Sequence, residues 1–121
     1  MTVNNLTLLD STVFGEPSGN YDGSTNYFYG DPVKAVGYYR GQGSIETATI
    51  RVEDFEGIIT VQATLNEDPA LAAWIDIYEY SSASGTITEI HPVTVTGNFC
   101  FMRVYITEFN SGTIGPITLT Y

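Results

Sequence analysis

Acid–base or metal chemistry has few residues to draw on in this sequence. His91 is the only histidine and Cys100 the only cysteine among the 121 residues. A Ser–His–Asp triad would have to use His91, which stands in the strand-like stretch "EIHPV" without a nucleophile motif such as G-x-S-x-G. A zinc site needs three or four His, Cys or carboxylate ligands, and these two residues stand apart. We therefore expect no catalytic residue, no metal ligand and no enzyme activity.

Carboxylates are the one abundant reactive group. They gather in three places: Asp22 and Asp31; Glu53, Asp54 and Glu56; Glu67 and Asp68. Oxygen-rich loops of this kind can hold calcium, but the regular ligand spacing of a calcium-binding loop is absent. We expect solvated acidic turns, with no cofactor and at most weak calcium binding.

The net charge and the lack of long apolar runs argue against nucleic acid and membrane as partners. With 14 acidic residues against four Lys and Arg, the net charge is −10, which repels a nucleic-acid backbone. No apolar run is long enough to span a membrane, and the first residues lack the basic start and apolar run of a signal peptide. We expect neither nucleic acid nor membrane as a partner. The acidity itself fits either plain solubility or a salty medium.

An early loop, residues 14–31, is the most suggestive segment for binding. Its aromatic residues stand among Gly, Asn, Ser and Asp: Tyr21, Tyr27, Phe28 and Tyr29. Aromatic rings with small polar neighbours are typical of binding loops, because they offer a large contact area at low entropic cost. These rings either stack on sugar rings or fold back over the protein as a packed loop.

The elements that must position these residues are strands. Turn signals recur every ten residues or so between runs rich in Val, Ile, Thr, Tyr and Phe. The expected strands cover residues 5–10, 33–39, 47–52, 57–65, 74–80, 87–95, 97–107 and 117–121, with a tight link at 53–57 and a turn at 109–113. The one helical turn is expected at 66–73, where Asp68 could cap a start at Pro69. We predict an all-β protein, a single antiparallel β-sandwich domain over residues 1–121 with about eight strands. A jelly roll is the first choice of topology and an immunoglobulin-like sandwich the second.

Period-two alternation predicts which side chains form the core. The expected core residues are Ile50, Val52, Ile59, Val61, Leu65, Ile75, Ile77, Met102, Val104, Ile106, Ile117 and Leu119. Phe55 is expected beneath the link at residues 53–57. Cys100 shares a strand face with Met102 and is therefore expected to be a buried thiol.

The other face of that same strand, residues 97–107, is unusual. It carries Phe99, Phe101, Arg103 and Tyr105. Three rings in a row on one strand face would form an exposed apolar stripe, which is typical of a contact surface. Either a neighbouring subunit covers this face, or the early loop of the same chain does, with Arg103 bonded to Asp22 or Asp31. We predict that these four residues form an oligomer interface.

The C-terminal half carries a recognisable series of structural positions. They are Phe55, Gly57, Ala63-Thr64-Leu65, Pro69, Trp74, Gly97-Asn98-Phe99, Arg103 and Gly112-Thr113-Ile114. With these positions the chain resembles a group of small proteins from tailed phages of marine cyanobacteria and their relatives. It departs from the pattern at Phe101, where the relatives often have Trp, at Met102 in place of Val, and at Glu108 in place of Asn. The first 40 residues hardly share in the resemblance.

The resemblance implies a viral structural protein of a bacteriophage: a decoration, neck or tail component found in the virion after synthesis in the host cytoplasm. Its expected partners are other virion proteins and further copies of itself, as a homo-oligomer for which a trimer is one option. The alternative is a carbohydrate-binding module that recognises host glycans through Tyr21, Tyr27, Phe28 and Tyr29.

Overall fold

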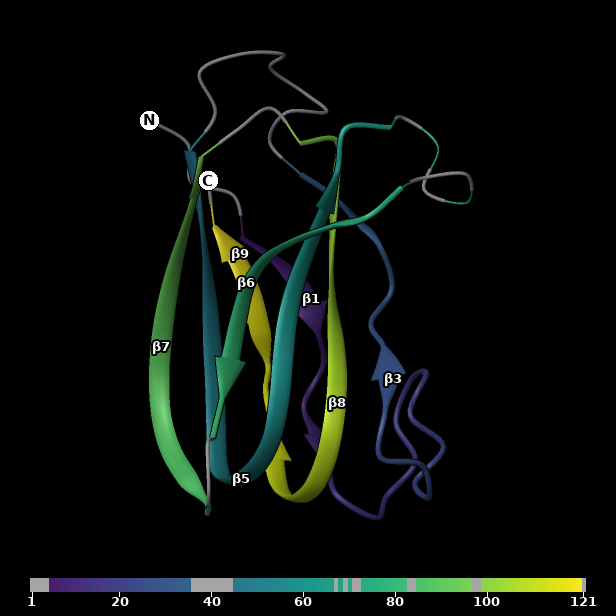
Figure 1. The fold of residues 1–121 in the computed structure, drawn as a ribbon, viewed down its shortest axis with the longest axis vertical. Helices are drawn as coiled ribbons and strands as arrows, with labels where there is room; N and C mark the ends of the chain where they lie inside the picture. Colours follow the sequence, from purple (N-terminus) through teal and green to yellow (C-terminus); the bar gives the residue numbers. More distant parts are fainter. Residues whose placement is uncertain are drawn as a thin grey trace.

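A computed structural model describes residues 5–35, 45–66, 68, 70, 73–82, 85–96 and 99–120. Within these residues the chain forms nine strands and no helix, joined in one antiparallel sheet (Figure 1). The strands are β1 (Asn5–Leu9), β2 (Thr12–Val13), β3 (Phe28–Tyr29), β4 (Val33–Lys34), β5 (Ile45–Thr64), β6 (Ile75–Ser81), β7 (Ile87–Thr96), β8 (Phe101–Ile114) and β9 (Ile117–Thr120). The all-β, antiparallel class expected from the sequence is confirmed. The part of the chain that the structure describes holds no helix capable of crossing a bilayer.

Strand β5 is the centre of the sheet and has long partners on both sides. On one side, β8 and then β9 pair with it, from Thr64 opposite Phe101 to Thr47 opposite Thr120. On the other side, β6 and then β7 pair with it in the same antiparallel sense. The sheet therefore has three adjacent rows of strands: β6 with β7, then β5, then β8 with β9. Strand β1 pairs with β9 at the outside of this sheet, and both β3 and β4 pair with β8.

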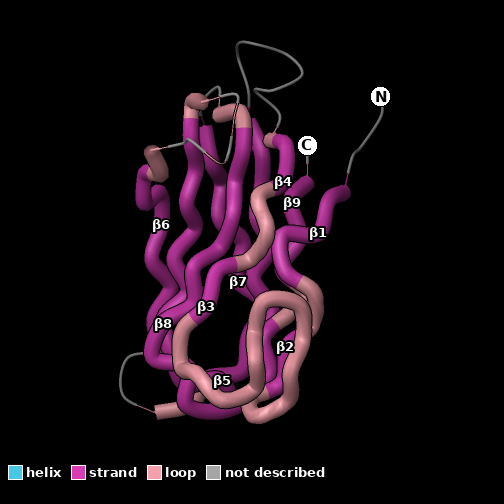
Figure 2. The backbone as a smooth tube through the Cα atoms, turned by 90° about the vertical axis from the view of Figure 1, so that its right-hand side faces the viewer, coloured by secondary structure: helices cyan, strands magenta, loops and turns pink. Residues whose placement is uncertain are grey.

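Strands β5 and β8 bend at the same level, and the sheet folds over itself into two facing layers (Figures 1 and 2). At the bend the register of β5 shifts against both β7 and β8. Asp54 and Glu108 have φ values of 50° and 51°, and Gly112 has 89°. Bulges with positive φ turn a strand without ending its ladder. We call the half of the sheet with β1, β9, β7 and the start of β5 layer 1, and the half with β3, β4, β6, the start of β8 and the end of β5 layer 2.

Two chain interruptions expected from the sequence are therefore wrong. The link at residues 53–57 lies inside β5, and the turn at 109–113 lies inside β8. Both segments carry Gly and polar residues that signal a turn, but they bend a continuous strand instead of reversing the chain.

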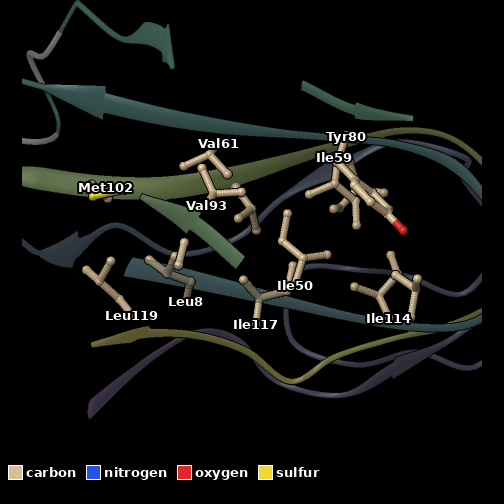
Figure 3. Packing of buried hydrophobic residues seen from close by; sticks show 14 of the residues in the cluster. Leu8, Ile50, Ile59, Val61, Tyr80, Val93, Met102, Ile114, Ile117 and Leu119 are labelled. Atoms are coloured by element: carbon tan, nitrogen blue, oxygen red, sulfur yellow. The ribbon is translucent and has the colours of Figure 1, made fainter. Parts of the chain in front are cut away.

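The core fills the space between the layers (Figure 3). Most of the core residues predicted by alternation are buried, among them Ile50, Val61 and Met102, each fully inaccessible. Leu65 and Ile75 are the wrong predictions, with 62% and 46% of their surfaces exposed. Leu65 directly follows the last residue of β5, and Ile75 is the first residue of β6, so both lie where the ladder of paired residues ends.

Aromatic residues fill the inside of the bend. Phe55 and Phe109 are completely buried, with ring centroids 5.9 Å apart, so the expected burial of Phe55 is confirmed. Tyr21 from the early loop packs against Phe109 at 5.4 Å, and Phe28 packs against Tyr21 at 5.0 Å. Figure 2 shows this loop lying beside β2 at the folded end of the sheet.

Of the strand expected over residues 97–107, residues 97 and 98 lie outside the described residues, and the described part begins at Phe101, after Phe99 and Cys100. Phe99 packs against the core cluster instead of continuing the outer face of β8. Cys100 is half-buried, not fully buried, and its thiol lies 3.4 Å from the carbonyl oxygen of Leu65. Residues 36–39 of the expected second strand, and residues 67, 69, 71 and 72 of the expected helical turn, lie outside the described residues.

Candidate functional site

The outer face of layer 2 carries an arginine held between two aromatic rings. The guanidinium carbon of Arg103 lies 4.3 Å from the ring centroid of Tyr29 and 4.3 Å from that of Trp74. Tyr29 in turn stacks on Tyr105, with centroids 4.1 Å apart and ring planes within 12° of each other. We call these four residues the arginine stack.

Three separate parts of the chain build this stack. Arg103 and Tyr105 stand two residues apart on β8 and therefore share a strand face. Tyr29 reaches Tyr105 because β3 pairs with β8 in a register that places the two residues opposite each other. Trp74 immediately precedes β6, on the far side of β5. The sequence indicated the first relationship only, since the other two depend on pairings of distant segments.

Side-chain hydrogen bonds across three neighbouring strands hold Arg103 in place. Arg103 Nε donates to Gln62 Oε1 at 2.8 Å, and Gln62 Nε2 donates to Asp76 Oδ1 at 2.8 Å. The three residues stand opposite one another on β8, β5 and β6. Burial lowers the pKa of Arg103, an effect opposed by Tyr29. Arginine nevertheless keeps its charge in proteins, so the stack contains a fixed cation.

The predicted interface residues have different environments. Phe101 is buried, with 8% of its surface exposed, and Phe99 faces the core, whereas Arg103 and Tyr105 are half-buried on the outer face. The same chain supplies part of the cover through Tyr29 and Trp74. The alternative with the early loop as cover had Arg103 bonded to Asp22 or Asp31, but Arg103 Nε donates to Gln62 Oε1 instead.

The four aromatic residues of the predicted ligand loop also differ in their exposure. Tyr21 and Phe28 are core residues, with 1% and 5% of their surfaces exposed, whereas Tyr27 and Tyr29 are exposed at 56% and 41%. The Tyr29 ring already stacks on Tyr105 and contacts Arg103, which leaves less of it for a sugar ring than the sequence alone suggests.

The two acidic residues of the early loop already accept hydrogen bonds from that loop. Asp22 Oδ1 accepts hydrogen bonds from the backbone N–H groups of Ser24 and Thr25, which lower the pKa of Asp22. Asp31 Oδ1 accepts from Asn20 Nδ2. Among the described residues, no group of three or more His, Cys, Asp and Glu side chains is placed to hold a metal ion. Glu67 lies outside those residues.

His91 belongs to a second polar group, at the edge where β6 of layer 2 faces β7 of layer 1. Its Nε2 lies 2.7 Å from the hydroxyl oxygen of Tyr78, and Tyr80 donates its hydroxyl proton to Glu89 Oε1 at 2.5 Å. The Tyr80 and His91 rings are 5.1 Å apart. Burial, and then the hydrogen bond to Glu89, raise the pKa of Tyr80. We call Tyr78, Tyr80, Glu89 and His91 the edge cluster.

The edge cluster was missed at the level of sequence, although a signal for it exists. "YEY" and "EIH" each place two polar side chains two residues apart, which puts each pair on one strand face. The sequence pattern does not indicate that these two faces oppose each other.

No protein-family model, no curated protein and no solved structure matches this chain. The arginine stack and the edge cluster therefore carry the functional argument.

Proposed function

We propose that this protein is a non-enzymatic structural component of a virus particle, which assembles as a homo-oligomer with the arginine stack at the subunit contact. The observation that carries the proposal is the clamping of Arg103 between Trp74 and Tyr29 on an outer sheet face. Trp, Tyr and Arg are the residue types most enriched among the side chains that dominate binding energy at protein interfaces.

The stack is ordered before any partner arrives. An interface side chain usually loses about 0.5–1.5 kcal/mol of conformational freedom on association. Arg103 has already lost this freedom to the two rings and to Gln62, and Tyr29 has lost it to Tyr105. A rigid and partly exposed aromatic–arginine surface therefore favours a role in binding another macromolecule.

The placement in a phage particle, as a decoration, neck or tail component, is supported by the sequence resemblance. Several residues that carry the resemblance belong to the bend of the sheet or to the arginine stack. Gly57 and Gly112 lie at the bend, and Trp74 and Arg103 form half of the arginine stack. The resemblance thus covers the surface to which we assign assembly. It also supports contact with other virion proteins and a location in the virion.

Size-exclusion chromatography with light scattering tests the assembly. Wild-type protein should form a homo-oligomer, for instance a trimer. The double variant Tyr29→Ser with Arg103→Glu should be monomeric and keep its β-sheet circular dichroism spectrum. Arg51→Glu changes an exposed arginine on layer 1 and is the matched control, which should stay assembled. A monomeric wild type, or an unchanged double variant, contradicts the proposal.

The second candidate is a carbohydrate-binding module that reads host glycans through the early loop. The exposed Tyr27 ring favours it, since a sugar needs an accessible ring to stack on. A glycan array compares wild type with Tyr27→Ala. Binding that is lost in the variant supports this function, and an empty array for the wild type removes it.

A further inference from the structure

Tyr29 and Tyr105 form a pair of tyrosines in direct ring contact on the outside of the protein. Their ring centroids are 4.1 Å apart and their ring planes lie within 12° of each other. The two residues stand opposite each other on β3 and β8, which lie side by side in Figure 1. Tyr29 has 41% of its surface exposed and Tyr105 is half-buried, so a reagent from the solvent can reach the pair.

The hydroxyl groups of the two rings lie on the same side of the stack. Side chains of directly opposite residues leave an antiparallel pair in the same direction. Burial, and then the charge of Tyr29 and a hydrogen bond to its side chain, raise the pKa of Tyr105. The ring carbons next to each hydroxyl therefore lie close together across the stack.

From this arrangement we propose that Tyr29 and Tyr105 are an oxidative cross-linking site, at which a peroxide joins the two rings within one chain as dityrosine. A phenoxyl radical carries much of its unpaired electron on the ring carbons next to the oxygen, and two such radicals combine where these carbons meet. Holding the two rings in contact converts an encounter of two diffusing partners into a reaction within one molecule.

The reaction balances with hydrogen peroxide as the oxidant, acting through a haem peroxidase or another one-electron catalyst. Each tyrosine gives one electron to the catalyst and its phenolic proton to the solvent. The two radicals form one carbon–carbon bond, the hydrogens on the joined carbons leave as protons, and the two oxygens each regain a proton. In total the pair loses two electrons and two protons, which convert one hydrogen peroxide molecule into two water molecules.

Other tyrosines of the described chain are less well placed for this coupling. Tyr21 and Tyr80 have only 1% and 5% of their surfaces exposed, so an oxidant does not reach them. Tyr27 is 56% exposed, but it precedes β3, whose pairing with β8 sets Tyr29 opposite Tyr105. Exposure and ring contact together therefore select the Tyr29–Tyr105 pair.

A bond at this site would fasten the early loop to the sheet. The strands that flank and end this loop, β2, β3 and β4, contain only two residues each, so short ladders hold it. The chain has a single cysteine and cannot form a disulfide within itself. A covalent bond from Tyr29 to Tyr105 closes a long loop, which restricts the unfolded chain as a disulfide does.

The test is oxidation of the purified protein by hydrogen peroxide with a haem peroxidase, and in parallel by a small ruthenium photo-oxidant with persulfate, which also reaches tyrosines in an assembled protein. Wild type should gain dityrosine fluorescence in the single-chain band of a denaturing gel. Mass spectrometry of its proteolytic peptides should find the Tyr29 peptide joined to the Tyr105 peptide, lighter than their sum by two hydrogen atoms. The thermal midpoint of the cross-linked chain should rise by more than about 5 °C.

Variants assign the cross-link to the pair. Tyr29→Phe and Tyr105→Phe each remove one phenol but keep the ring, so both should fold. Each should lower the single-chain fluorescence by at least about tenfold, because the remaining tyrosine has lost the partner held against it. Tyr27→Phe keeps the pair and should leave the signal unchanged.

Three outcomes overturn the proposal. With neither oxidant giving dityrosine in the wild type, the stack is only a ring contact. A single-chain signal that survives in folded Tyr29→Phe comes from other tyrosines. Fluorescence found only in covalent dimers means that the coupling joins two copies, a result that contradicts the cross-link within one chain and leaves the proposed assembly standing.

Discussion

Gly112 lies so close to Asp54 that a Cβ atom on Gly112 would stand 2.3 Å from the Asp54 carbonyl oxygen. The two residues belong to β8 and β5 at the point where the sheet folds over. Gly112 also has a φ of 89°, which L side chains rarely adopt. The close approach of the two bent strands therefore requires glycine at this position.

Gly112→Ala should lower the free energy of unfolding by more than about 2 kcal/mol, because it adds a backbone clash to an unfavourable φ. Gly19 is the matched control, since it has a φ of 57° and a Cβ atom there would meet nothing within 4 Å. Gly19→Ala should cost only about 1 kcal/mol. Urea unfolding measures both. Equal losses would mean that the contact at the bend is unimportant.

Val61→Ala should cost about 1–3 kcal/mol, since it removes buried methyl groups from the middle of the core. Leu65→Ala, four residues along the same chain segment, should cost less than about 0.5 kcal/mol because Leu65 is largely exposed. Thermal or urea unfolding of the two variants measures the difference. A large loss at Leu65 together with a small one at Val61 would mean that the core covers the end of β5 and not its middle.

Arg103→Ala should change the fluorescence of Trp74, the only tryptophan of the chain. Removing the guanidinium uncovers one ring face to water, which should shift the emission to longer wavelength. The variant should also lose about 1–3 kcal/mol, because Gln62 keeps a buried amide oxygen without its donor. Arg51→Ala should leave the emission unchanged, and an unchanged spectrum for Arg103→Ala would argue against the stack.

Stability should fall at alkaline pH through Tyr80. The pKa of this phenol is raised in the folded protein above its ordinary value of about 10. The unfolded chain therefore loses the proton first, so the stabilisation is complete below pH 10 and declines as the pH rises above it. Urea midpoints from pH 8 upward should fall above about pH 10 in the wild type and less steeply in Tyr80→Phe. Tyr27→Phe, at an exposed site, should follow the wild type.

Calcium should have little effect on stability. Asp22 already accepts hydrogen bonds from its own loop, and calcium would have to displace them. Saturating calcium should raise the melting temperature by less than about 10 °C, since a larger rise implies several kcal/mol of linked binding. Differential scanning calorimetry with calcium and with a chelator decides this.

Alternation predicted the inward faces of Ile50, Val61 and Met102 well, because it depends only on the local chain. It failed at Leu65 and Ile75, because alternation does not indicate where the ladder of paired residues ends. The early loop shows the same limit. Composition left open whether its rings bind a sugar or pack on the protein, and it did not indicate that Tyr21 and Phe28 would be the packed ones, beside the buried aromatic pair of the bend.

The candidate sites could be predicted only in part. The sequence singled out Arg103 and the outer face of its strand, and it indicated the early loop as one cover. Trp74 and Gln62 reach Arg103 through pairings along β5, which no local pattern reports. For the edge cluster, His91 was interpreted alone, since its tyrosine partners stand on a different strand.

The bent central strand also sets how the chain must fold. β5 can pair early with β6, its near neighbour in sequence, but its other ladder joins Thr64 to Phe101 and Thr47 to Thr120. Closing such long loops costs entropy before the ladder can offset it, and folds dominated by distant pairings form on millisecond to second timescales. Folding should therefore be slow for a chain of this size. Substitutions at the bend should slow folding further, because the two layers can pack against each other only after β5 and β8 have both bent.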